Sequence, residues 1–149
     1  MRISAKGEYA IRAILDLAMR HGKGLVPIQE IAARQGIPQR YLEQVLLLLK
    51  RAGFLVSKRG SAGGYDLERP PGEITVGEVL RAVEGNLTPL EVVGRGRRGR
   101  RRSAASEELA DLWQEISDAV AAVIDRTSFA DLSKRAEARR AAARPMYHI

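Results

Sequence analysis

Residues 38–53 of the chain read PQRYLEQVLLLLKRAG. Four apolar residues in this stretch recur at i, i+3, i+4 and i+7, so that they share one side of a helix: Leu42, Val45, Leu46 and Leu49. Pro38 suits the first position of this helix, and Gly53 suits its end. The preceding segment PIQEIAARQG, residues 27–36, predicts a shorter helix over about Val26 to Arg34.

Two short helices joined by a glycine are typical of a helix-turn-helix, whose second helix lies in the major groove of DNA. The side chains that point away from the apolar side of this second helix are mostly long and polar. We expect them to reach base edges or phosphates, unless they form only a solvated face: Gln39, Arg40, Tyr41, Glu43 and Gln44. Leu47 belongs to the same outward side, where it either packs on the next element or is exposed.

Residues 54–69, FLVSKRGSAGGYDLER, predict a β-hairpin with strands at Phe54–Val56 and Tyr65–Leu67. No helix follows its tip, and the Walker spacing is missing, which argues against a nucleotide-binding loop. Small residues allow the backbone to approach phosphates, and an arginine suits a narrow minor groove. The basic tip is therefore the predicted wing, with DNA-binding candidates Lys58, Arg59, Gly60, Ser61, Gly63 and Gly64.

A first helix is predicted from about Ser4 to His21, and a capping box at Thr75–Glu78 predicts a short helix that Gly85 ends. Lys6 lies in the first turn of the first helix, where a cation opposes the helix dipole. It is either a phosphate contact or a solvated lysine. Residues 1–85 thus predict a winged helix-turn-helix DNA-binding domain, mainly α with a small β-hairpin wing (α+β).

The remainder is predicted to contain an Arg-rich loop over 86–106, and a long dimerisation helix with a C-terminal helix and tail over 107–149. The run Arg95–Arg102 is either a DNA-phosphate arm or a solvated linker. Glu107 to Arg126 carry an apolar seam that we expect at a twofold homodimer interface, with folding back on the first helix as the alternative. The seam residues are Leu109, Leu112, Trp113, Ile116, Val120, Val123 and Ile124.

The composition favours an acidic partner. The formal net charge is +7, and residues 1–70 hold 12 Lys and Arg against 6 Asp and Glu, a net of +6. Double-stranded DNA is more consistent with this charge than a membrane surface. The absence of cysteine excludes disulfides and thiolate metal sites, and the two histidines lie at opposite ends. We therefore expect a cytoplasmic protein that is not an enzyme and holds no cofactor or metal.

With these residues in view, the chain resembles bacterial winged-helix regulators of the Rrf2 family over about residues 1–132. The motifs that carry the resemblance occur in one order: Met1–Ser4, Lys6-Gly7, Tyr9-Ala10, Ile31-Ala32, Gln35–Ile37, Tyr41–Gln44, Arg59-Gly60, Gly63–Tyr65, Gly77–Val79, Leu112-Trp113, Asp118–Val120 and Asp131-Leu132. The resemblance implies a homodimer that binds a pseudo-palindromic operator and mostly represses transcription. It also implies that Tyr41, Glu43 and Gln44 start the reading helix.

Iron–sulfur members of this family, such as IscR and NsrR, hold a cluster with three cysteines, whereas this chain has Val92 where the first is expected. It is more similar to the CymR type, through Pro89–Val92 and the tail Met146–Ile149. That similarity implies repression of sulfur and cysteine-metabolism genes without a cofactor, and cysteine synthase (O-acetylserine sulfhydrylase) as a partner. The alternatives are a repressor that senses a small ligand or a stress signal, and a non-specific nucleic-acid-binding protein that uses the Arg-rich loop.

Overall fold

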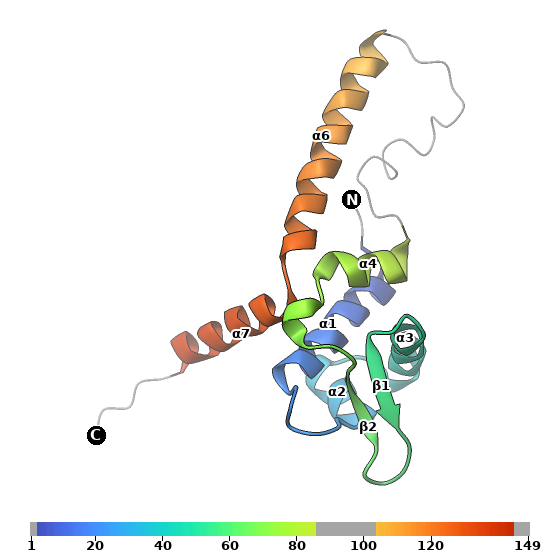
Figure 1. The fold of residues 1–149 in the computed structure, drawn as a ribbon, viewed down its shortest axis with the longest axis vertical. Helices are drawn as coiled ribbons and strands as arrows, with labels where there is room; N and C mark the ends of the chain where they lie inside the picture. The colour runs from blue at the N-terminus through green and yellow to red at the C-terminus, as the bar shows by residue number, and fades with distance from the viewer. Residues whose placement is uncertain (1–2, 86–103, 145–149) are drawn as a thin grey trace.

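A computed structural model describes residues 3–85 and 104–144 (Figure 1). The described part is mainly helical with one two-stranded antiparallel sheet, which confirms the predicted fold class. Its elements, in chain order, are α1 (Ala5–Met19), α2 (Ile28–Gln35), α3 (Gln39–Arg51), β1 (Leu55–Lys58), β2 (Gly64–Leu67), η1 (Pro71–Glu73), α4 (Val76–Glu84), α6 (Ala104–Arg126) and α7 (Phe129–Ala143). The Arg95–Arg102 run and the tail Met146–Ile149 lie outside the described residues.

The core forms where α1, α3 and α4 pack together, because each carries an apolar stripe at helical spacing. All four predicted inward residues of α3 are at most 1% exposed. On the inward side of α1, Tyr9 is half-buried, and five further apolar residues are buried: Ala10, Ala13, Ile14, Leu17 and Ala18. The helix-turn-helix and the wing are thus mounted on one continuous apolar core.

The boundaries of α2 and α3 differ slightly from the prediction. Val26 does not start α2, because its backbone pairs with Tyr65 of β2 through N–H···O bonds of 2.9 and 2.8 Å. Pro38 is the N-cap of α3 and not its first helical residue, since its ψ of 128° is extended. Gly36 and Gly53 do end helices, and both have positive φ, at 63° and 89°.

The wing is the hairpin β1–β2, with Leu55 opposite Leu67 and Lys58 opposite Gly64. Its strands extend further toward the tip than predicted, because Lys58 and Gly64 pair with each other and leave only residues 59–63 to turn. The short helix η1 follows the hairpin and was not predicted. The capping box at the start of α4 is confirmed, since Glu78 N–H donates to Thr75 Oγ1 and Thr75 N–H donates to Glu78.

The long helix α6 projects from the core, and α7 leaves its end in a different direction (Figure 1). The alternative that α6 folds back along α1 is wrong, because α6 packs on α4 and it is α7 that packs on α1. The corner between them docks on the start of α4. Val76 N–H donates to Thr127 O at 2.9 Å, and Phe129 N–H donates to Ile74 O at 3.0 Å. Phe129 is completely buried in the same core as α1 and α3.

Candidate nucleic-acid interface

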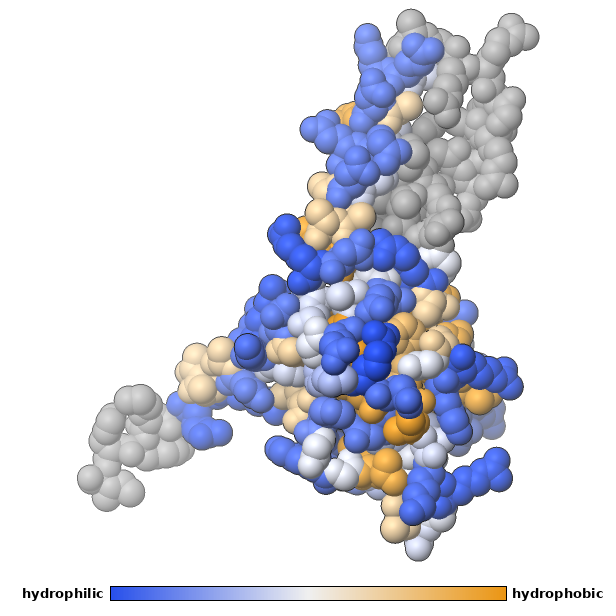
Figure 2. Space-filling model, in the orientation of Figure 1, coloured by the Kyte–Doolittle hydropathy of each residue, from blue (hydrophilic) through white to orange (hydrophobic). Residues whose placement is uncertain are grey.

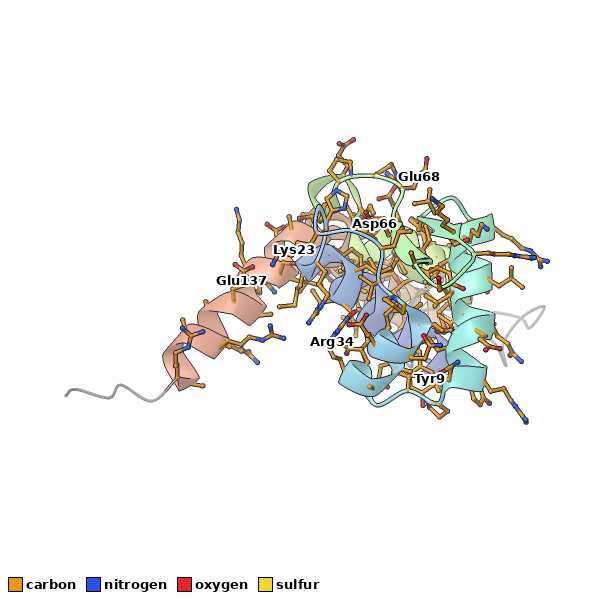
Figure 3. All side chains as sticks on the ribbon, turned by 90° about the horizontal axis from the view of Figure 1, so that it is seen from below. Tyr9, Lys23, Arg34, Asp66, Glu68 and Glu137 are labelled. Carbon is orange, nitrogen blue, oxygen red and sulfur yellow. The ribbon has the colours of Figure 1, made fainter. Side chains whose placement is uncertain are left out.

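The outward side of α3 faces solvent along its whole length. Gln39, Arg40, Glu43 and Gln44 are exposed, and within the described ranges none of the four forms a side-chain hydrogen bond or ion pair. Figure 3 shows α3 at the edge of the molecule, with side chains pointing away from the other helices. These predicted residues therefore lie together on one free surface, as DNA contact requires.

Tyr41 has a second role in addition to its exposure of 54%. Its ring meets the Tyr9 ring of α1 edge to face, with centroids 6.1 Å apart. The Arg12 guanidinium lies over the Tyr9 ring, 5.8 Å from its centroid. The contact fixes the start of α3 against α1. Lys6 is exposed on α1, one turn before Tyr9, which places this predicted phosphate contact on the same side as the start of α3.

Asp16 positions the helix-turn-helix, although it was not among the residues predicted from the sequence. Its side chain is 1% exposed and accepts hydrogen bonds from Arg34 Nε and Nη2, both at 3.0 Å, and from Gln35 Nε2 at 3.1 Å. These bonds join α1 to the end of α2, just before the turn into α3. The bond to Asp16 raises the pKa of Arg34 further above its usual value. A carboxylate within the apolar stripe of α1 was the signal for this contact.

The wing presents a basic tip. Lys58, Arg59, Gly60 and Ser61 are exposed, whereas Gly63 is half-buried and Gly64 is buried. A Cβ atom on Gly63 would lie 2.1 Å from the Lys58 carbonyl oxygen, so this glycine shapes the turn. Lys50 Nζ of α3 donates to Ser57 Oγ of β1 at 2.6 Å. The wing and α3 are thereby held as neighbours.

The seam of α6 is largely uncovered. Leu109, Leu112, Ile116 and Val123 are between 36% and 50% exposed, while Trp113, Val120 and Ile124 are half-buried. Apolar side chains are visible at the surface of α6 in Figure 2. A different side of this helix packs on α4. There Gly77 allows close approach, since a Cβ would lie 2.0 Å from Asp125 Oδ1, and Arg81 Nη2 donates to Asp125 Oδ2 at 2.9 Å.

The comparisons with known proteins agree with this geometry. The model of Rrf2, described as an iron-dependent transcriptional regulator, matches residues 3–135. The chain belongs to the Rrf2 family.

Individual Rrf2 relatives are similar over most of their length. The chain is 37% identical to the transcriptional regulator CymR of Bacillus subtilis, over 89% of this chain and 90% of that protein. It is also 37% identical to IscR of Aliivibrio salmonicida, over 89% and 77%. Among solved structures, CymR, the global cysteine regulator of B. subtilis, gives a TM-score of 0.78 at 36% identity, covering 91% of this chain and 98% of that one. IscR of T. potens gives 0.76 at 33% identity, covering 99% and 94%. These similarities support a DNA-binding transcription regulator with a winged-helix fold, as the family resemblance implied.

The donor groups of this Rrf2 chain do not fit a thiolate-bound iron centre, because the full sequence contains no cysteine. Among residues 3–85 and 104–144, no three His, Asp or Glu side chains gather where they could hold a metal ion. His21 instead lies 3.1 Å from Asp66 through Nδ1 and Oδ1. None of the helices in these ranges could cross a membrane.

A further feature of the described residues is an open cleft of about 500 Å³ between the end of α1, the α1–α2 loop, α2 and α7. Its lining is mainly charged, with Lys23, Arg34, Glu137 and Arg140 contributing to its walls. Figure 3 shows Lys23 and Glu137 close together, where the loop meets α7. The cleft therefore joins the helix-turn-helix to the C-terminal helix.

Proposed function

We propose that this Rrf2 protein is a homodimeric repressor that binds a pseudo-palindromic operator in a sequence-specific manner. The observation that carries the proposal is the free outward side of α3, which presents Arg40, Glu43 and Gln44 on a helix that packs on strand β1 of the basic wing. Such side chains read base edges when a helix enters the major groove, and the arginine and lysine of the wing suit phosphates and the minor groove. Lys6, Gln39 and Tyr41 complete the surface at the start of α3.

The dimer is proposed from the uncovered seam of α6. Four large apolar side chains on one side of a projecting helix are unusual for a monomer, and α4 already occupies a different side. A second copy of α6 covers such a seam through the same residues on both chains, which gives a twofold interface. Two reading helices related by that twofold bind half-sites about one helical turn apart, roughly 34 Å.

For the regulated genes, we propose sulfur and cysteine metabolism without an iron–sulfur cluster. The sequence identities to CymR and IscR are equal at 37%, so they do not separate these two types. The absence of cysteine supports the CymR type, because a thiolate-held cluster needs ligands that this chain lacks. The CymR-like reading also supplies the proposed partner, cysteine synthase (O-acetylserine sulfhydrylase).

A small ligand is a second candidate for the regulatory signal, and the charged cleft between α2 and α7 favours it. Its volume of about 500 Å³ lies within the usual range for metabolite sites. Pull-down of cysteine synthase with and without O-acetylserine separates the two candidates. A complex supports the enzyme partner, and no complex under either condition leaves the ligand as the proposal.

Genomic footprinting of the tagged protein, followed by binding titrations on the footprinted duplex, tests the proposed function. At about 150 mM salt, the operator should be bound at least a thousandfold more tightly than a scrambled duplex. Arg59→Ala should weaken binding to both duplexes, whereas Glu43→Ala should change which base pairs are preferred. Equal binding of operator and scrambled duplex contradicts the proposal. In that case, loss of binding on deleting residues 94–102 indicates a non-specific nucleic-acid-binding protein.

A further inference from the structure

One residue on the outward side of α3 differs in chemistry from its neighbours. Leu47 is 47% exposed, whereas three other leucines of the same helix, at 42, 46 and 49, are fully buried. It lies one turn beyond Glu43 and Gln44, and one turn before Lys50 and Arg51, so polar residues surround it on the helix surface. An aliphatic side chain is therefore held on the same outward side of α3 as the proposed reading residues, one turn beyond them.

The wing does not cover Leu47. The sequence left open whether this leucine packs on the hairpin, and its exposure shows that it does not bury itself there. The contact between α3 and β1 lies one turn further on, where Lys50 reaches Ser57. The side chain of Leu47 consequently remains available to a molecule that approaches α3 from solvent.

The charge around Leu47 indicates which kind of molecule approaches. Arg40, Lys50 and Arg51 lie on the same outward side, against one carboxylate, Glu43. An apolar protein surface would have to desolvate these cations without neutralising them, whereas a DNA groove brings phosphates to meet them. The α6 seam is different, because its residues are all apolar, so a second copy of this chain suits that seam better than it suits the cation-lined surface around Leu47.

The floor of the major groove offers one apolar group, the 5-methyl of thymine. We propose that Leu47 is a specificity-determining residue that selects thymine by contact with this methyl group. The inference rests on the proposed function, because it requires α3 to enter the major groove. The polar residues at 40, 43 and 44 read the hydrogen-bonding edges of bases. Leu47 makes thymine preferred over cytosine at one position in each half-site.

The experiment replaces thymine by deoxyuridine, one position at a time, in both half-sites of the footprinted operator. Deoxyuridine keeps the base pairing and removes only the methyl group. For the wild type, replacement of thymine by deoxyuridine at one particular position should weaken binding about fourfold for each half-site. This is the effect expected when one buried methyl group is removed from a contact. Leu47→Ala, which keeps the helix because alanine is a good helix former, should bind thymine and deoxyuridine operators equally.

Val56→Ala is the matched control, because Val56 is another exposed aliphatic residue, at 39%, on β1 of the wing. It should retain the wild-type preference for thymine, and circular dichroism should show that both variants are folded. The inference is overturned if deoxyuridine has no effect on the wild type, if Leu47→Ala keeps the preference, or if Val56→Ala loses it. In each of these cases the operator is still preferred over scrambled DNA, whereas failure of the proposed function removes that preference.

Discussion

The same apolar periodicity occurs in two regions, the compact head formed by α1–α4 and the projecting helix α6. Its apolar residues are buried in the head and exposed on α6. In the head, Leu42 and Leu49 are completely buried, and in α6, Leu109 and Leu112 are 50% and 44% exposed. The residue type and the helical spacing are the same in both places. The comparison teaches that periodicity defines which side of a helix is apolar, while the surrounding elements decide whether that side is covered within one chain.

The boundary between the two regions does not follow the order of the sequence. Phe129 lies after the long helix, and yet it fills the core of the head together with residues of α1 and α3. The head is therefore completed by the chain that returns from α6. Four substitutions, taken from the largest expected effect to the smallest, test this division.

Phe129→Ala should lower the free energy of unfolding by about 4 kcal/mol, because it empties a fully buried aromatic site. Denaturant titration followed by circular dichroism measures the loss. Phe129→Leu is the control and should lose less than half as much, since it retains most of the side-chain volume. Wild-type stability of the alanine variant would show that the start of α7 is not part of the head's core.

Asp16→Asn should cost about 3 kcal/mol, at the lower end of the range for breaking a buried ion pair, since the Arg34 side chain is 30% exposed and can be hydrated. The same denaturant titration detects it. Asp111→Asn on the exposed surface of α6 is the matched control and should change stability by less than about 0.5 kcal/mol. Equal effects of the two substitutions would remove the role given to Asp16.

Leu112→Ala should weaken the dimer and leave the head intact. Leu112 is 44% exposed in one chain, so dimerisation can bury only about half of its side chain. Loss of that burial should cost about 1 kcal/mol of dimerisation free energy per copy, or about 2 kcal/mol for the symmetric pair. Sedimentation equilibrium should then show a dissociation constant about thirtyfold higher. Glu115→Ala, exposed on the same helix off the seam, should leave it unchanged. A wild-type protein that is monomeric at micromolar concentration contradicts the proposed interface.

Arg81→Gln should have the smallest effect, below about 1 kcal/mol, because both partners of the Arg81–Asp125 pair are partly exposed. The hydrogen bond from Arg81 lowers the pKa of Asp125 below its ordinary value of 3.8. A carboxyl group with a lowered pKa stabilises the folded state at pH values above its ordinary pKa. That stability is lost as the pH falls through the lowered pKa. The difference from the wild type should therefore be present at pH 7 and decrease as the pH falls below 3.8. A difference that persists in acid would point to lost packing instead.

The sequence predicted the elements of the head well, because periodicity, capping boxes and turn glycines are local signals. Leu42, Thr75 and Gly36 could be placed without knowledge of any distant residue. The failures involve contacts between residues far apart. A carboxylate in the apolar stripe of α1 was a local signal for Asp16, but its partner Arg34 depends on how the helices meet. The pairing of Val26 with Tyr65 and the place of Phe129 in the core depend on this as well. For the candidate site, the sequence identified the outward residues of α3, but it could not decide whether Leu47 was covered.

The corner where Val76 and Phe129 are hydrogen-bonded to the neighbouring segments has a consequence for DNA geometry. Because residues on both sides of the corner are hydrogen-bonded to the segment at the start of α4, the axis of α6 cannot rotate freely relative to α3. A paired molecule would then hold its two reading helices at one separation and one relative angle. Adding a base pair between half-sites turns one of them by about 34° around the duplex, and a rigid pair cannot follow that turn. Spacer length in the operator should consequently matter as much as base identity.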